Sequence, residues 1–470
     1  MAIERKELSP AEINRQMEIC ARLRARLAND GTRPLALVDT YGCQQNEADS
    51  ERLRGYLREM GFGFTEDEYE ADVIVINTCA VREHAEQRVL GNVGALGHTK
   101  RAKPGQLIAL CGCMVERPGM AERIRQSYRL VDLAFGPQDL WRFPELLEQA
   151  MARKGRVCAI GGADTVAEGL PVYRREGPKA WLSVMYGCNN FCSYCVVPYV
   201  RGRERSRRPE AVLDEARQLI ASGVRDITLL GQNVNSYGRD LDGTDFPSLV
   251  RAVCALDGDF LVRFMTSHPK DATEALFRAM AENEKCAHHL HLPVQAGSDR
   301  ILRAMNRHYD RASYLEKVAC ARELMPDLVL TTDIIVGFPG ETEEDFADTL
   351  SLVEQVEYDA MFTFLFSPRP GTPAAEMPDP TPREEKQARF DRLLETANAI
   401  SAKKHAAYIG TTQRVLVDGA DEARPGMLCA RTNGGRLVRF AGDTQLVGTF
   451  ADVRITGCST WALDGALYTE

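Results

Sequence analysis

The sequence predicts an α/β protein of three parts: an N-terminal parallel-sheet domain, a central partial (β/α)6 barrel and a small C-terminal β-barrel. Its 470 residues exceed what one ordinary hydrophobic core supports. From Pro34 to about Ala150, and again from Ala180 to about Phe366, strand-like apolar runs alternate with helical patterns, which indicates parallel sheets covered by helices. After about Thr411 the pattern changes to short alternating runs between glycine-containing turns, which predicts a small antiparallel barrel.

The first 150 residues contain one helix and then a repeated strand–helix pattern. Residues 1–32 are an N-terminal extension, and apolar spacings of three and four predict an amphipathic helix over residues 1–30. The first domain covers residues 33–150, and a linker with a Gly-rich turn covers residues 151–173. Strands of this domain are predicted at Leu35–Asp39, Val73–Asn77 and Leu107–Cys111.

One cysteine follows each of these strands, namely Cys43, Cys79 and Cys113. Ligands of parallel sheets bind beyond the carboxyl ends of the strands, so we expect the three thiols to meet there. They could then hold three irons of a cluster and leave one iron open. Cys111 competes with Cys113, and we prefer Cys113 because Cys111 still lies in the predicted strand. The alternative is three loop thiols that never meet.

A second group of three cysteines lies in the segment YGCNNFCSYCVVPYVRGRERSRR. Cys188, Cys192 and Cys195 have the spacing C-x3-C-x2-C. Three thiolates from one short loop can hold three irons of a [4Fe–4S] cube, and the fourth iron is then free to bind a small molecule. The alternatives are a zinc site or three unrelated buried thiols. A closed zinc site needs a fourth ligand nearby, and the next Cys or His in the chain is Cys254.

The central domain, residues 174–404, has six predicted strands: Trp181–Met185, Asp226–Leu230, Leu261–Met265, His289–Leu292, Val329–Ile335 and Met361–Phe364. The chemistry of parallel barrels lies at the C-terminal ends of the strands. Polar residues are found at these ends: Gln232, Asn233, Asn235, Ser267, His268, Gln295 and Asp333. Each could merely cap a turn. Their recurrence at successive strand ends favours a shared pocket.

A group of possible zinc ligands, Cys286, His288, His289 and His291, lies in the same domain. Neighbouring residues of a strand face opposite sides, so His288 points away from His289 and His291. Polar residues that face the inside of a barrel explain this group better than a metal site does.

A basic run starts six residues after Cys195 and contains Arg201, Arg203, Arg205, Arg207 and Arg208. Arginine suits phosphate groups and nucleic-acid bases, and the run lies near the mouth of the predicted site, so we expect contacts to substrate phosphates. The alternative is a solvated loop with internal ion pairs. The formal net charge of −9 does not exclude a nucleic-acid partner, because screening limits charge effects to roughly 8–10 Å.

These motifs resemble the radical S-adenosylmethionine (SAM) enzymes, whose signature is C-x3-C-x2-C with an aromatic residue, here Tyr194, before the last Cys. The longer strings GCNNFCSYCVVPYVRGRERSR, TYGCQQNEADSE and NTCAVRE are similar to the methylthiotransferase family within that group. HLPVQAGSDRILRAMNRHY resembles its branch that acts on N6-dimethylallyladenosine in tRNA. Residues 407–470, by pattern only an OB-like barrel, resemble the RNA-binding TRAM domain.

The resemblance implies two [4Fe–4S] clusters and SAM as cofactors. SAM would bind the open iron at Cys188, Cys192 and Cys195, and its reductive cleavage would give a radical that removes hydrogen from C2 of the adenosine at position 37. The cluster of Cys43, Cys79 and Cys113 would supply sulfur, which a second SAM methylates. The implied SAM contacts are Tyr194, Gln232, Asn233, Ser267, Gln295 and Asp333. Ala296 stands where the family more often has Ser, so one hydroxyl contact would be missing.

We expect the partners to be the anticodon stem-loop of tRNA, a reducing electron donor such as flavodoxin or ferredoxin, and an unknown sulfur source. We also expect a monomer, located in the cytoplasm because the chain has neither a signal-peptide pattern nor a membrane-spanning apolar run. Its fourteen cysteines fit cluster ligation better than disulfides.

Three alternatives stay open. The substrate could be threonylcarbamoyladenosine in tRNA or an aspartate of a ribosomal protein. A protein of another class, an iron–sulfur RNA-binding redox sensor, is disfavoured because such proteins normally ligate every iron of a cluster, whereas each site here offers three cysteines.

Overall fold

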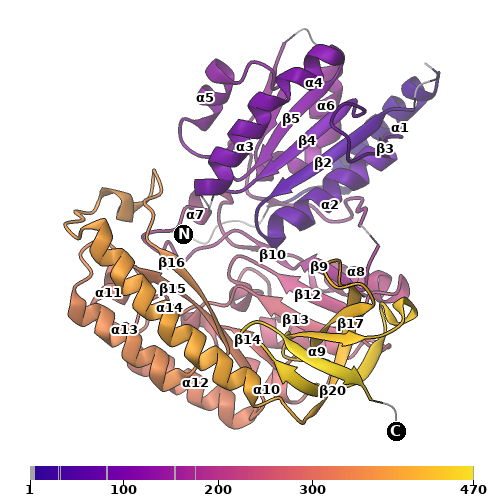
Figure 1. Cartoon of the computed structure of the whole chain (residues 1–470). Coiled ribbons are helices and arrows are strands. Elements are labelled where there is room, and N and C mark those ends of the chain that lie inside the picture. Colours follow the sequence, from indigo (N-terminus) through magenta and orange to yellow (C-terminus); the bar gives the residue numbers. More distant parts are fainter. Residues whose placement is uncertain are drawn as a thin grey trace.

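Two parallel sheets and a small closed barrel follow one another along the chain, which confirms the predicted α/β class (Figure 1). The computed structural model describes residues 6–29, 31, 33–80, 83–152, 155–174 and 176–468. Within these ranges, no helix combines the length and the apolar character that crossing a membrane would require.

The N-terminal domain is a six-stranded parallel sheet in the order β3-β2-β4-β5-β6-β7. Its strands are β2 (Leu35–Tyr41), β3 (Gly63–Phe64), β4 (Val73–Thr78), β5 (Leu107–Gly112), β6 (Leu133–Phe135) and β7 (Val157–Ala159). The sheet order reverses at β2, since β3 lies on one side of it and β4 on the other. Such a switch point is where parallel sheets bind ligands, because the connecting loops separate there.

Helices cover both faces of this sheet, so β4 is buried along its whole length. One face packs against α1 (Pro10–Asn29), α2 (Gln44–Glu59) and α6 (Phe143–Ala152). The other packs against α3 (Glu83–Ala95) and α5 (Met120–Ser127), and the short helix α4 (Gly97–Ala102) follows α3. The short strands β1 (Lys6–Glu7) and β8 (Thr165–Val166) pair with each other. The helix predicted over residues 1–30 is observed from Pro10 as α1, whereas Lys6–Glu7 form β1 and residues 1–5 lie outside the described ranges.

The central domain places six parallel strands side by side in chain order. They are β9 (Lys179–Ser183), β12 (Asp226–Leu230), β13 (Leu261–Met265), β14 (His289–His291), β15 (Val329–Val336) and β16 (Ala360–Leu365). The first three and last three form separate sheets, joined by a bridge between Val262 and Cys286. Because β9 and β16 each have one strand neighbour in the described chain, the barrel is partial, as predicted.

Helices cover the outside of this partial barrel: α8 (Pro209–Ala221), α9 (Phe246–Cys254), α10 (Glu274–Ala281), α11 (Asp299–Ala304), α12 (Arg311–Leu324) and α13 (Glu343–Val356). The predicted strand Trp181–Met185 is divided in two. β9 ends at Ser183, and Met185–Tyr186 forms β10, which pairs with β11 (Arg205–Ser206). The loop between β10 and β11 carries the second cysteine group and the short helix α7 (Val197–Val200).

Helix α14 (Arg383–Ala406) leads into a closed barrel with the strand order β17-β18-β19-β21-β20. These strands are β17 (Thr412–Ala420), β18 (Met427–Thr432), β19 (Leu437–Ala441), β20 (Phe450–Cys458) and β21 (Leu463–Leu467). The pair β19–β21 is parallel, so the expected all-antiparallel pattern is wrong there. Arg263 of β13 joins this barrel to the central domain, since its Nη2 donates to the Thr432 carbonyl at 3.0 Å.

Candidate functional site

Cys43, Cys79 and Cys113 lie directly beyond β2, β4 and β5, which are neighbours in the sheet. Cys43 is the N-cap of α2. The pKa of Cys43 is lowered to about 6 by a hydrogen bond with Cys79. Burial opposes this effect, and the charge of Arg201 adds to it. A thiolate at a helix N-terminus is also favoured by the helix dipole. The fold therefore gathers three thiols that are far apart in sequence, at the sheet's switch point.

Local packing brings the loops of this group together. Gly112 has φ +95°, and a Cβ on it would lie 2.4 Å from both Asn77 Oδ1 and the Thr78 carbonyl oxygen. Only glycine permits this backbone conformation and this close approach at low cost. Asn46 Nδ2 donates to Asn77 Oδ1 and to the Thr78 carbonyl, each at 3.0 Å. The loops that carry Cys43, Cys79 and Cys113 are therefore fixed to one another.

Cys111 and Cys113 have different surroundings. Cys111 lies inside β5 and packs in the apolar core with Phe135, and burial raises the pKa of its thiol well above the ordinary value. Cys113 lies beyond the strand end, and its Sγ accepts a hydrogen bond from Arg201 Nε at 2.9 Å. Of the two, Cys113 has the position and the partner of a ligand.

Cys188, Cys192 and Cys195 lie in a loop that is held against the central domain. Asn306 Nδ2 donates to the Phe191 carbonyl at 2.9 Å, and Ser193 N donates to the Met305 carbonyl at 3.0 Å. Burial, together with the nearby Glu204 and Cys192, raises the pKa of Cys188 to about 12. Burial and the two neighbouring thiols likewise raise the pKa of Cys195. Cys192 thus lies close enough to both Cys188 and Cys195 to raise the pKa of each.

The two cysteine groups suit clusters better than single ions. Within the described ranges, no three His, Cys, Asp or Glu side chains converge on a point that could hold one metal ion. A [4Fe–4S] cube binds each thiolate at a different iron, so its ligands surround a volume and do not meet at a point. Three thiols per group match that donor set.

Several buried polar atoms lie at the C-terminal ends of β12 and β13. Asn233 Oδ1, both side-chain atoms of Asn235, and Ser267 Oγ have no hydrogen-bond partner in the described part of the chain. Such atoms are rare in folded proteins, because an unpaired buried polar group costs about 1–3 kcal/mol. Thr266 and Gln295 have φ of +74° and +73°, and strained backbone of this kind gathers at functional sites. These strand ends are therefore suited to a polar ligand.

The remaining predicted pocket residues have varied positions. Gln295 is buried and pairs with Ile334 through a β-bridge, and Gln232 is half-buried. Asp333 lies within β15 instead of at its end, and its Oδ1 is 3.5 Å from His291 Nε2. Tyr194 is half-buried in the cysteine loop.

Sequence reasoning missed Arg307, which lies at the centre of this site. Its Nη1 donates to Cys192 Sγ at 3.2 Å and lies 3.4 Å from Tyr194 Oη, while its Nη2 donates to the Pro293 carbonyl at 2.8 Å. Arg307 is 4% exposed. It lies between α11 and α12, more than a hundred residues from the cysteine loop, so no local motif indicates the contact.

Two phenylalanines on the inner face of β16 were also missed. Phe362 pairs in register with Asp333, and its ring contacts His291 edge-on, so it faces the barrel interior. Phe364 follows two residues later on the same face. Their exposed fractions are 53% and 44%, whereas Met361 and Leu365 on the opposite face pack into the core. The open edge of the barrel therefore presents apolar surface.

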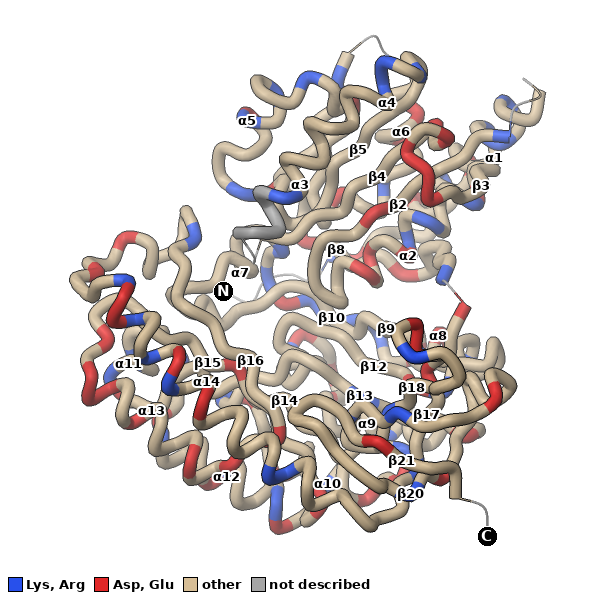
Figure 2. The backbone as a smooth tube through the Cα atoms, viewed as in Figure 1, with Lys and Arg blue, Asp and Glu red and all other residues tan. Residues whose placement is uncertain are grey.

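The structure corrects the expectation for three of the five arginines. Arg201, Arg205 and Arg207 are buried, because their guanidinium groups pair inside the protein with Asp49, Asp164 and Glu215. They therefore cannot reach a substrate phosphate. Figure 2 shows this basic segment near β10, where the N-terminal domain meets the barrel. Arg203 and Arg208 are exposed; Arg203 stacks on Phe191 at 4.3 Å, and Arg208 pairs with Glu7.

The possible zinc ligands have other partners. His289 and His291 both contact Thr331 Oγ1, at 3.4 and 3.0 Å, on the inner face of the barrel. His288 instead pairs with Asp327 at 2.7 Å. Cys286 interacts with Cys254. These contacts agree with the expectation that His288 points away from His289 and His291.

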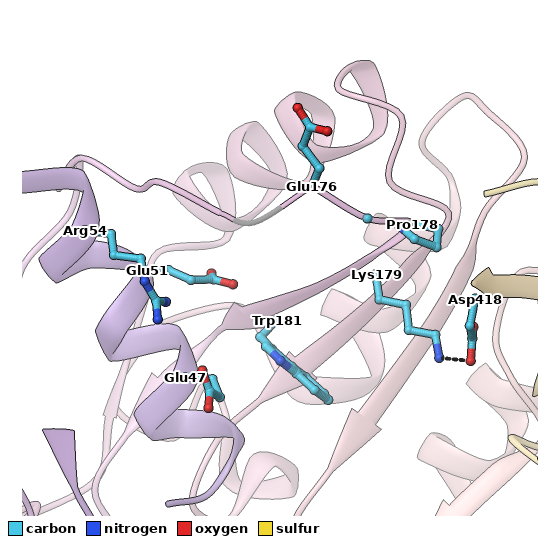
Figure 3. Close-up of a pocket in the computed structure, with 9 residues that line it drawn as sticks. Glu47, Glu51, Arg54, Glu176, Pro178, Lys179, Trp181 and Asp418 are labelled. Atoms are coloured by element: carbon cyan, nitrogen blue, oxygen red, sulfur yellow. Dashed lines mark ion pairs between the residues drawn. The ribbon is translucent and has the colours of Figure 1, made fainter. Parts of the chain in front are cut away.

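A pocket of about 290 Å³ lies where all three domains meet. Figure 3 shows Trp181 of β9 between Glu47 of α2 and the ion pair of Lys179 with Asp418, whose N–O distance is 2.7 Å. Carboxylates outnumber basic side chains in its lining, so the pocket does not favour phosphate.

Family comparisons agree with this architecture. Residues 182–353 match the Radical SAM superfamily, residues 406–468 match the TRAM domain, and residues 36–136 match a family described as uncharacterized protein family UPF0004. A solved radical SAM methyltransferase, TsrM from Kitasatospora setae, covers 73% of this chain and 75% of its own with a TM-score of 0.55. At 16% identity this likeness shows the fold alone. The fold and site thus define a radical SAM protein with a TRAM domain, a class that uses a [4Fe–4S] cluster and SAM.

Closer relatives specify the branch. A protein of Acetivibrio thermocellus named tRNA-2-methylthio-N(6)-dimethylallyladenosine synthase is 48% identical over 98% of this chain and 97% of its own. A protein of the same name from Alkaliphilus oremlandii is 47% identical over 98% of both chains. The chain belongs to the family of tRNA-2-methylthio-N(6)-dimethylallyladenosine synthases.

Proposed function

We propose that this protein attaches a methylthio group to C2 of N6-dimethylallyladenosine at position 37 of tRNA, next to the anticodon. The observation that carries this proposal is the pair of three-cysteine groups, one beyond the strand ends of the N-terminal sheet and the other in the loop between β10 and β11. The two loops meet across the domain boundary at the Cys113–Arg201 hydrogen bond. Two such groups match a reaction that needs one site for radical formation and one for sulfur. The names of the relatives supply the substrate.

The cysteines have separate roles in this proposal. Cys188, Cys192 and Cys195 would hold the cluster that binds SAM, and Cys43, Cys79 and Cys113 would hold an auxiliary cluster. When bound, these cofactors supply the radical that removes the C2 hydrogen and the sulfur and methyl groups that replace it.

The protein's own polar groups would position SAM. Asn233 and Ser267 supply unpaired buried atoms, which fit the amino, carboxylate and ribose groups of SAM. Gln232, Gln295, Asp333 and Tyr194 complete the proposed contact set. Arg307 adds a fixed positive charge beside Cys192 and orients Tyr194. These groups can bind SAM but offer no base for an aromatic C–H bond, so the radical chemistry comes from the cofactors.

The RNA would be held by exposed groups of two domains. Arg203, which stacks on Phe191, and Arg208 offer exposed guanidinium groups next to the cysteine loop. The TRAM domain supplies a second surface, which includes the exposed Trp461. Phe362 and Phe364 give the open edge of the barrel an apolar face suited to the dimethylallyl group. We propose that this protein works as a cytoplasmic monomer with a flavodoxin- or ferredoxin-type electron donor.

Mass spectrometry of nucleosides from total tRNA, with and without this gene, tests the reaction. Loss of the methylthio group with accumulation of N6-dimethylallyladenosine supports the proposal. Loss from threonylcarbamoyladenosine would change the substrate, and unchanged tRNA would indicate a protein substrate or a non-catalytic protein.

Single cysteine variants test the two clusters. Cys192→Ala should abolish 5′-deoxyadenosine formation and leave half of the iron in place. Cys113→Ala should retain SAM cleavage and lose methylthiolation, whereas Cys111→Ala should retain both because Cys111 is a core residue. If Cys111→Ala instead retains SAM cleavage and loses methylthiolation, then Cys111 is the cluster ligand and the assignment of Cys113 is wrong.

A further inference from the structure

Arg201 belongs to the loop of one cysteine group, but its side chain contacts the other. It follows Cys195 by six residues. Its Nε donates a hydrogen bond to Cys113 Sγ at 2.9 Å, and its Nη2 donates to Asp49 Oδ2 at 2.9 Å. Arg201 and Asp49 are only 4% and 5% exposed. A buried charge pair therefore lies directly beside one thiol of the N-terminal group.

The short segment between Cys195 and Arg201 is also packed against that thiol. Helix α7 occupies this segment, and Val196 and Val200 form a buried apolar cluster with Ala80 and Cys113. Gln138 Nε2 donates to the Val200 carbonyl at 3.3 Å. These contacts fix the end of one cysteine loop against the end of the other.

A charge or hydrogen bond at a cluster ligand changes the cluster's reduction potential. Reduction adds negative charge to the cluster and its thiolates, so a hydrogen-bond donor and a positive charge stabilise the reduced form. A carboxylate at the same place has the opposite effect. Both effects are large for buried groups, since water does not screen them.

We propose that Arg201 is a positioning residue for the auxiliary cluster. Through its hydrogen bond to Cys113, Arg201 raises the reduction potential of that cluster, and it also holds the two cysteine groups at a fixed separation. Asp49 orients the guanidinium and partly offsets its charge. This inference rests on the proposed function, because it needs a cluster at Cys43, Cys79 and Cys113.

The test uses the full-length chain with Cys188, Cys192 and Cys195 all replaced by alanine, so that only the auxiliary cluster remains. Its midpoint potential is measured by a redox titration followed by electron paramagnetic resonance. In this background, Arg201→Gln should lower the potential and Asp49→Asn should raise it. The opposite signs separate an electrostatic role from a general loosening of the site, which would shift both variants in the same direction. Arg203→Gln is the matched control, because it removes an exposed arginine two residues away and should leave the potential unchanged.

Each outcome decides between distinct claims. If the triple-alanine background holds no iron, the cluster assignment of the proposed function fails. If the background holds a cluster whose potential is the same with Arg201→Gln, the inference about Arg201 fails while the proposed function stands. If Arg201→Gln loses the cluster, the Asp49→Asn variant decides: a higher potential supports the inference, and an equal or lower one overturns it.

Discussion

Arg207 Nη1 donates to Glu215 Oε2 at 2.7 Å where the N-terminal domain meets the barrel, and Arg207 is buried there. Arg174 approaches the same carboxylate at 2.5 Å, and Arg52 of α2 lies close enough to lower its pKa. Glu215 thus neutralises Arg174 at the start of the central domain, Arg207 just after β11, and Arg52 of the first domain. Much of the basic run that was predicted to contact RNA therefore forms ion pairs where the two domains meet.

Glu215→Gln should destabilise the protein by about 3 kcal/mol at neutral pH. Burial would raise the pKa of Glu215, but the three arginines outweigh burial and lower it to about 2. Since the pKa is lower in the folded state, this stabilisation is full above the unfolded-state pKa near 4.5 and is lost as the pH falls towards 2. Urea unfolding gives the difference in free energy of unfolding between the unchanged protein and Glu215→Gln, and this difference should be smaller at pH 4 than at pH 7. Glu210→Gln, an exposed change on the same helix, should have little effect; equal losses in both variants would contradict the prediction.

Arg307→Gln should slow 5′-deoxyadenosine formation by about tenfold or more. The substitution removes a buried charged hydrogen bond to Cys192 and the contact that orients Tyr194, and such bonds contribute about 1.5–3 kcal/mol. The product is measured by chromatography with iron content determined in parallel. Arg303→Gln, an exposed change on α11, is the control. An undiminished rate with full iron content would show that Arg307 has only a packing role.

Phe362→Ala should raise the KM for tRNA that carries N6-dimethylallyladenosine by about tenfold, because covering a phenyl ring contributes about 1.5–3 kcal/mol. Binding of tRNA with unmodified adenosine should change little, so the variant should discriminate less between the two RNAs. Competition between the two substrates measures this directly. Tyr69→Ala, which removes an exposed aromatic ring of the N-terminal domain, should leave the discrimination intact. A uniform loss of affinity for both RNAs would refute a contact with the dimethylallyl group.

Arg203→Gln should weaken tRNA binding and reduce the slope of log affinity against log salt concentration by about one. Arg203 is exposed and stacked on Phe191, so its guanidinium is held next to the cysteine loop and is available to a phosphate. Binding is measured at several salt concentrations. Arg217→Gln on α8, which removes an exposed arginine paired with Asp214, serves as the control. Parallel salt slopes for Arg203→Gln and the unchanged protein would exclude this contact.

The sequence alone determined the class of fold and the grouping of the cysteines. Alternation of strands and helices depends on local apolar spacing, so β12 and β13 were predicted to the residue. Parallel topology then places Cys43, Cys79 and Cys113 at one sheet edge, because each follows a strand.

Only the tertiary structure decided which charges face inward. Arg201 and Arg203 are two residues apart in one basic run, but one is buried against Asp49 and the other is exposed. Arg307 reaches Cys192 from a distant loop. Burial and ion pairing depend on which segments meet in space, and a local pattern holds no information about a partner contributed by another domain.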